Sequence, residues 1–329
     1  MNPAPLQEER RIEIHLGTLC NNRCVFCMSA DKRDKREPWA QLERVREELR
    51  HFRAKGCGSV GFLGGEPTVY PHIVECVAYA RELGFSRISI CTNGVRFSDA
   101  RFCERLVGAG LTRVSVSVHS HRAEVEDGLM TRVPGNLARK IEGIRNLAAL
   151  RGRGFLRDNL SLNPVLCRPN LHELEEFVEF FAALGAEDVR FNYIWPHGDV
   201  RNDRAWIPSL AEAMPEIVRA MLRNETVRRR RLTFGAVPKC ALRLAGVSGK
   251  LLEYLAGKYL DEACFDPPND VSMATRGERP EDRFVWQTVK RDQFKTMPPS
   301  CVRCRWAPGC DGVWKSYADL YGFAGLEPV

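Results

Sequence analysis

The sequence predicts an α/β fold made of six strand–helix units within residues 1–223. Short apolar segments of strand length alternate with longer segments of helical periodicity, and the connections between them are short. Several helical segments also have capping residues: Ser98 and Asp99 open one, and Gly84 and Gly185 close two others. This alternation is typical of a parallel sheet whose strands are joined by helices.

The elements follow one another in a regular order. The predicted strands span residues 12–16, 60–63, 87–91, 113–119, 160–166 and 189–195. The predicted helices span residues 40–55, 71–83, 98–108, 137–150, 171–184 and 209–223. Six units are two short of a complete eight-unit barrel. From residue 224 the alternation is expected to stop, with an apolar helix-like segment at 241–260 and an irregular stretch at 265–282.

Side-chain alternation along the strands indicates a polar barrel interior. In the 113–119 segment the valines share one face, and Ser115, Ser117 and His119 share the other. Helices cover the outside of such a barrel, so we expect the valines to face them. The same pattern places further residues on the inner face: Glu13, His15, Ser89, Cys91, Ser161, Asn163, Arg190 and Asn192. The interior is therefore predicted to be hollow and to hold a ligand, although a one-residue slip in register would invert the faces.

Cys20, Cys24 and Cys27 form the most informative motif, with C-x3-C-x2-C spacing directly after the first strand. Three thiolates are one ligand short of a structural zinc site, which usually has four. They suit a four-iron cluster in which the protein holds three irons and leaves one open for chemistry. An open iron indicates a catalyst. The alternative is a zinc knuckle or a group of buried thiols.

This spacing, with Phe26 just before the third cysteine, resembles that of the radical S-adenosylmethionine (SAM) enzymes. Residues 63–68, with the sequence LGGEPT, lie where that family has its GGE segment. The resemblance implies a partial six-unit barrel, open on one side, with its site at the C-terminal ends of the strands. It also implies a 4Fe–4S cluster that gives one electron to SAM. The carbon–sulfur bond then breaks, and the resulting 5′-deoxyadenosyl radical removes a hydrogen atom from the substrate.

The resemblance further implies which residues contact SAM. Its amino and carboxyl groups would bind the open iron, and Gly64, Gly65 and Glu66, followed by Pro67, would hold the amino group. The backbone around Phe26 would meet the adenine. Polar residues late in the middle and last strands are candidates for the ribose, carboxylate and adenine contacts: Ser117, His119, Asn163, Asn192 and Tyr193.

Cys301, Cys304 and Cys310 form a second cysteine group with C-x2-C-x5-C spacing. Three thiolates need a fourth ligand, and Cys240 is the predicted one, with Cys264 as its competitor. The arrangement resembles the SPASM and Twitch extensions of radical SAM enzymes, with too few cysteines for a two-cluster SPASM region. It implies one auxiliary 4Fe–4S cluster of Twitch type within residues 224–329. Zinc is the alternative, because soft thiolates also select zinc.

Composition indicates where the protein is located and which kinds of partner it has. The 329 residues are 44% hydrophobic and 28% charged, as in a soluble globular protein, and none of the apolar runs approaches a membrane span. The N-terminus has no apolar signal segment, so we expect a cytoplasmic protein with no membrane partner. Thirteen cysteines then favour metal binding over disulfides. The net charge of +7 and the arginine run at 228–231 do not favour a nucleic-acid partner, since a solvated helix end explains the run.

The reaction is less constrained. By resemblance, an oxidoreductase or maturase is predicted that oxidises, crosslinks or epimerises a peptide or natural-product substrate, with flavodoxin or ferredoxin as electron donor. Small-molecule or cofactor biosynthesis is the first alternative, and an RNA-modifying radical SAM enzyme is the second. A non-catalytic iron–sulfur or zinc protein is the alternative from a different class.

Overall fold

The computed structural model describes residues 10–28, 39–228, 230–260, 269–272 and 284–329. Its main feature is a sheet of ten strands in the order β10-β9-β1-β2-β3-β4-β5-β7-β6, with β8 paired to β7. The strands are β1 Arg11–His15, β2 Ser59–Leu63, β3 Arg87–Thr92, β4 Arg113–Val116, β5 Leu160–Leu162, β6 Val165–Leu166, β7 Asp188–Tyr193, β8 Arg231–Gly235, β9 Asn269–Ser272 and β10 Phe284–Val285. Neighbouring strands are parallel except for β9 and β10.

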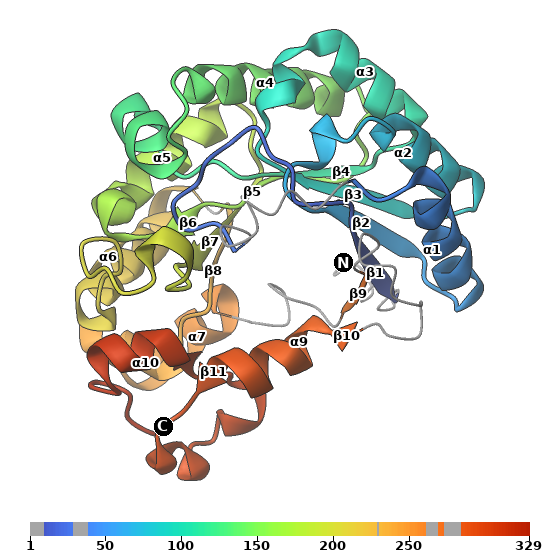
Figure 1. The fold of residues 1–329 in the computed structure, drawn as a ribbon. Helices are drawn as coiled ribbons and strands as arrows, with labels where there is room; N and C mark the ends of the chain where they lie inside the picture. Colours follow the sequence, from blue (N-terminus) through green and yellow to red (C-terminus); the bar gives the residue numbers. More distant parts are fainter. Residues whose placement is uncertain (1–9, 29–38, 229, 261–268, 273–283) are drawn as a thin grey trace.

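Helices connect the strands and cover one face of the sheet. They are α1 Leu42–Ala54, α2 Ile73–Glu82, α3 Ala100–Ala109, α4 Asn136–Gly152, α5 Leu174–Ala183 and α6 Leu210–Arg223. Figure 1 shows the sheet curving into an open arc with these helices around its outer side. The predicted α/β fold is confirmed, and the arc corresponds to a partial barrel. Within the described part of the chain, no helix is both long enough and apolar enough to cross a membrane.

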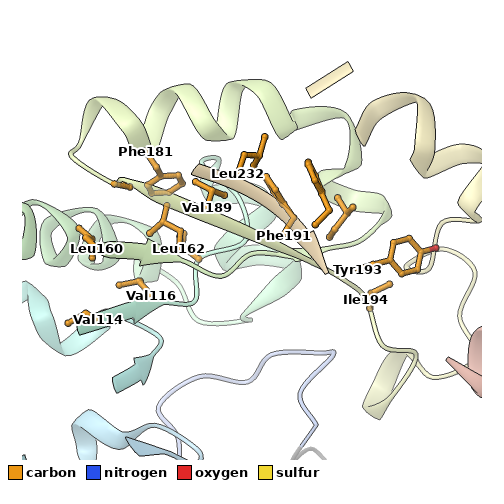
Figure 2. Close-up of a cluster of buried hydrophobic side chains, with 14 of the residues drawn as sticks. Val114, Val116, Leu160, Leu162, Phe181, Val189, Phe191, Tyr193, Ile194 and Leu232 are labelled. Carbon is orange, nitrogen blue, oxygen red and sulfur yellow. The ribbon is translucent and has the colours of Figure 1, made fainter. Parts of the chain in front are cut away.

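The two faces of the sheet differ as the alternation predicts. On the outer face Val114 and Val116 of β4 are completely buried. Figure 2 shows them in a row with Leu160 and Leu162 of β5. Burying each such side chain contributes about 1.5–3 kcal/mol, so this layer holds helices and sheet together. On the inner face the register sets polar groups side by side, for example Ser115 next to Ser161.

Two predicted strands are shorter than expected. The 113–119 strand ends at Val116, because the backbone amides of His119 and Ser120 donate to the Glu126 carboxylate instead of continuing the ladder. The 160–166 strand is interrupted before Pro164, which has no N–H to donate to a ladder, and resumes as β6.

The alternation does not stop at residue 224, contrary to the prediction. After α6 the chain enters β8, which pairs with β7 in parallel so that Phe234 lies opposite Phe191. Their rings stack at 5.3 Å between centroids and extend the apolar outer face. The division into 1–223 and 224–329 stays a prediction, and the sheet continues beyond its boundary.

The C-terminal segment crosses the open side of the arc (Figure 1). It contains α7 Gly249–Tyr259, α9 Trp286–Val289, α10 Lys315–Tyr321, and a pair of antiparallel strands, β11 Lys295–Thr296 and β12 Val313–Trp314. It touches both ends of the arc: β9 pairs with β1, and Tyr321 Oη donates to the Ile207 carbonyl (2.7 Å) near the start of α6. Cys264 and most of the 265–282 stretch lie outside the described residues.

Candidate active site

The three cysteines of the first motif lie in one tight loop after β1. The Cys27 amide donates to the Cys24 carbonyl (3.3 Å), and the Asn22 amide donates to the Cys20 sulfur (3.3 Å). Burial raises the pKa of Cys20 to about 11 and that of Cys24 to about 12, and the charge of the Cys27 thiolate acts in the same direction on both. A bound cation would favour the thiolate forms of Cys20 and Cys24, because an opposite charge counteracts the effect of burial.

The chemistry of this loop fits an iron–sulfur cluster. Three soft thiolates are the donors that such a cluster takes. Asn22 is 6% exposed, and its Nδ2 has no hydrogen-bond partner among the described residues, so the loop holds an unused donor for sulfur. In the described part of the chain, no three histidine, cysteine or acidic side chains converge as they would around a single metal ion.

The glycines of the 63–68 segment allow it to lie directly against the base of the cysteine loop. Gly65 donates its amide to the Gly17 carbonyl (2.7 Å) and Glu66 donates to the Leu19 carbonyl (2.9 Å). A Cβ on Gly65 would lie 2.1 Å from the Leu19 oxygen, and one on Gly64, where φ is +144°, would lie 2.6 Å from the Gly17 oxygen. Only glycine fits both positions, so the two sequence motifs form one unit.

The Glu66 carboxylate joins the end of β2 to the end of β3. Its Oε1 accepts from the Thr68 amide (3.0 Å), the Thr68 hydroxyl (2.5 Å) and the Thr92 hydroxyl (2.6 Å), and its Oε2 accepts from the Asn93 amide (2.6 Å). The side chain is 1% exposed. A carboxylate has about four acceptor positions, so the SAM amino group would share them with these donors. That predicted contact stays a prediction, as does the contribution of Pro67.

Thr92 and Asn93 are site residues that the sequence analysis missed. Besides their bonds to Glu66, Asn93 Nδ2 donates to Asn21 Oδ1 (2.6 Å) inside the cysteine loop and lies 3.9 Å from the Cys20 sulfur. The available signal was a polar pair followed by Gly94 at the C-terminal end of β3. That is the rim where the other two motifs end.

Phe26 and His119 lie against each other. Their rings make an edge-on contact at 4.9 Å between centroids. Burial lowers the pKa of His119 to about 4, so the ring is neutral at neutral pH. Its Nδ1 accepts from the Val165 amide (3.1 Å), which leaves the proton on Nε2.

The remaining predicted SAM contacts divide between the two faces. Ser117 and Asn163 hydrogen-bond Cys91 on the inner face, which counteracts the effect of burial that raises the pKa of Cys91 to about 11. Asn192 is also on the inner face, where its Nδ2 donates to the Arg190 carbonyl (3.3 Å). Tyr193 is not: it is buried on the outer face, and its hydroxyl donates to the Pro208 carbonyl. Figure 2 shows it in a cluster of buried hydrophobic side chains.

The second cysteine group comes together with the predicted fourth ligand. Cys240, Cys301, Cys304 and Cys310 line one cavity, with Trp306 beside them. Burial raises the pKa of Cys240 to about 12, and the charges of the other three cysteines act in the same direction. The Gly312 amide donates to the Cys310 sulfur (3.4 Å), as expected for a sulfur that becomes a thiolate.

Comparison with known proteins decides the family. The model of the radical SAM superfamily matches residues 14–181, which include β1, the cysteine loop and the 63–68 segment. The chain belongs to the radical SAM superfamily. It is therefore an enzyme whose cofactors are a 4Fe–4S cluster and SAM.

Curated relatives of this radical SAM chain include a GTP 3′,8-cyclase from Marinobacter nauticus, 32% identical over 211 residues, or 63% of this chain and 61% of that one. A GTP 3′,8-cyclase from Pseudomonas fluorescens is 34% identical over 163 residues, 49% and 47% of the two chains. This chain therefore matches only about three fifths of the length of the Marinobacter nauticus relative.

Solved structures with the same fold include Streptococcus suis SuiB bound to SAM, with TM-score 0.64 and 17% identity over 94% of this chain and 73% of that one. Another is anSMEcpe with bound AdoMet, with TM-score 0.64 and 13% identity over 97% and 89% of the two chains.

Proposed function

We propose that Cys20, Cys24 and Cys27 hold the 4Fe–4S cluster and that SAM binds beside it at the rim formed by the ends of β1 to β4. The cluster supplies one electron to break the carbon–sulfur bond of SAM. Three observations support this placement: the coupled thiols, the Gly64–Gly65 contact with the loop, and the Asn93 bond to Asn21. The protein orients SAM at the rim, while the half-buried Ser117 and Asn163 face the same interior.

We propose a small anionic molecule of the nucleotide class as the substrate, in cofactor biosynthesis. This replaces peptide modification as the favoured hypothesis. The curated relatives are named for their action on GTP, at 32% identity in the first case. The solved SuiB complex with its precursor peptide is only 16% identical and supports the fold alone. Small-molecule or cofactor biosynthesis was the first alternative predicted from the sequence, without a nucleotide being named.

The inner face of the barrel supports an anionic substrate. Arg113 and Arg190 both bond to the Asp188 carboxylate, at 3.4 and 2.9 Å, and Arg11 bonds to Glu13 at 2.8 Å. Burial lowers the pKa of Arg113 to about 10, and the charges of Arg190, Arg87 and Arg11 act in the same direction, while the charge of Asp188 opposes them. An anion would relieve this repulsion.

This arginine layer lies below the rim. Arg113 precedes Ser117 by four residues on the inner face, a rise of about 13 Å. A substrate bound there by its charged end would extend toward the radical.

We propose that Cys240, Cys301, Cys304 and Cys310 hold an auxiliary 4Fe–4S cluster of Twitch type. Four thiols around one cavity support a closed ligand set without an open iron. Zinc also takes four thiolate ligands, so metal analysis distinguishes the two.

The test is a deuterium-transfer assay. The protein is reconstituted with iron and sulfide without oxygen, reduced, and given SAM with GTP deuterated throughout the ribose. Deuterium in the 5′-deoxyadenosine supports both the radical and the nucleotide substrate. Formation of 5′-deoxyadenosine without deuterium overturns the nucleotide substrate alone.

Variants test the cysteine ligands in the same assay. We expect Cys20→Ala, Cys24→Ala and Cys27→Ala each to abolish SAM cleavage. The control is Cys76→Ala, at a buried thiol on α2, which should keep both iron and cleavage. Full cleavage by the three loop variants would overturn the ligand assignment.

A further inference from the structure

A completely buried ion pair lies behind the cysteine loop. Lys140 of α4 and Glu126 are both 0% exposed, and the Lys140 ammonium lies 2.5 Å from Glu126 Oε1. The ammonium also donates to the Ser117 carbonyl (2.8 Å), and Glu126 Oε2 accepts from the amides of His119 (2.7 Å) and Ser120 (3.0 Å). A buried pair is often no more stabilising than apolar residues of similar volume, so stability alone does not explain its presence.

The lysine side of the pair is joined to the loop through α4. Asn136, four residues before Lys140, lies on the same face of the helix. Its Nδ2 donates to Asn22 Oδ1 (2.7 Å), between the first two cysteines of the motif. One helical turn therefore separates a direct contact with the loop from the buried ammonium group.

The glutamate side reaches the loop by two further routes. Glu126 belongs to the π-helix Glu124–Met130, and the amides of Arg23 and Val25 donate to the carbonyls of Thr131 (3.0 Å) and Met130 (3.2 Å) at the end of that segment. The second route runs through His119, whose ring packs on Phe26. Together these contacts reach residues 22, 23, 25 and 26, on both sides of Cys24.

The two charges of the pair are compensated to different degrees. The Lys140 ammonium has two acceptors, Glu126 Oε1 and the Ser117 carbonyl. The Glu126 carboxylate is further neutralised by the two backbone amides that it accepts from. The negative charge is therefore the better compensated of the two, and the Lys140 ammonium contributes the larger uncompensated charge behind the loop.

We propose that Lys140, held by Glu126, is a positioning residue that sets the reduction potential of the cluster bound by the cysteine loop. Reduction adds one negative charge to the cluster. A desolvated cation behind the cysteine loop stabilises that charge, because electrostatic interactions are strong where water is excluded. The pair therefore makes it easier for a one-electron donor to reduce the cluster. This inference rests on the proposed cysteine ligands.

Opposite substitutions separate an electrostatic role from a structural one. The reconstituted full chain is poised at a series of potentials, and its reduced cluster is followed by electron paramagnetic resonance. The first cluster is recognised by the change in its signal when SAM is added. We expect Lys140→Met to shift the midpoint potential to more negative values and Glu126→Gln to shift it to more positive values. The double variant should fall between them.

The control is Lys258→Met. Lys258 lies on α7 and forms an exposed ion pair with Glu225, so its loss should leave the midpoint potential unchanged. Shifts of the same sign in the two single variants, or no shift in either, would overturn the inference. If Lys140→Met fails to take up iron, Glu126→Gln decides: a positive shift supports the inference, and any other result overturns it. An error in the proposed cysteine ligands would give a different result from an error in the role of Lys140. In that case the wild type itself would lack a SAM-sensitive signal.

Discussion

Gly65 occupies a position where any side chain would collide with the backbone of the cysteine loop. A Cβ there would lie 2.1 Å from the Leu19 oxygen and 2.5 Å from the Thr18 oxygen. We expect Gly65→Ala to displace the loop, with a loss of about 1–3 kcal/mol in the free energy of unfolding, as for other overpacked sites. Reconstituted iron and SAM cleavage should both fall. Denaturant titration and iron analysis without oxygen measure these effects.

Gly108→Ala is the matched control. Gly108 lies in α3, and a Cβ there meets no atom within 4 Å. Alanine should raise the stability by up to about 1 kcal/mol through helix propensity and leave the iron content unchanged. If Gly65→Ala behaves like this control, the tight contact between the two motifs is not required for the cluster.

At the residue scale, the sequence predicted the motifs and missed the residues that link them. The spacing of Cys20, Cys24 and Cys27 was sufficient to predict a metal loop. The bond from Asn93 to Asn21 and the burial of Lys140 depend on which strands and helices become neighbours, and no local pattern contains that information. Tyr193 was a candidate adenine contact because it lies late in the last strand, but the strand alternation that puts Asn192 on the inner face puts Tyr193 on the outer one.

At the scale of elements, the six helices lie within three residues of their predicted bounds at both ends. Ser209 caps α6 in a capping box: its hydroxyl accepts from the Glu212 amide (3.3 Å), and the Glu212 carboxylate accepts from the Ser209 amide (2.7 Å). We expect Ser209→Ala to lower the free energy of unfolding by about 1 kcal/mol. Thermal or denaturant unfolding of the reduced protein measures this.

Ser248 is the matched control for that prediction. It is the N-cap residue of α7, but its side chain makes no capping hydrogen bond. Ser248→Ala should therefore leave the stability within a few tenths of a kcal/mol. An equal loss in both variants would mean that the serine hydroxyl of Ser209 contributes nothing specific to α6.

The strand that the sequence analysis overlooked shows why element prediction has limits. β8 has the alternation of a strand, with Leu232 and Phe234 on one face, but its first residue, Arg231, is the last of an arginine run that indicated a solvated segment. What makes it a strand is the open edge of β7 and the stacking of Phe234 on Phe191. Both are tertiary features.

At the scale of the whole molecule, two cysteine sets lie on separate parts of the chain. The cavity of the second set is lined by residues of 238–240, 297–312 and 326–327, none of which belongs to the first loop. The C-terminal segment is docked by other contacts, among them the stacked rings of Trp195 and Trp314 at 4.8 Å between centroids. Loss of the second cluster should therefore leave the barrel intact.

We expect a Cys301→Ala/Cys304→Ala/Cys310→Ala variant to lower reconstituted iron from about eight to about four atoms per chain. SAM cleavage should persist, because the cluster that reduces SAM is held elsewhere, while turnover of the substrate should be lost. Iron analysis and 5′-deoxyadenosine measurement test both parts. The reciprocal Cys20→Ala/Cys24→Ala/Cys27→Ala variant should also keep about four irons but cleave no SAM. The chain has only one cluster if the Cys20→Ala/Cys24→Ala/Cys27→Ala variant keeps no iron, or if zinc fills the second site of the wild type. The C-terminal segment then has a structural role.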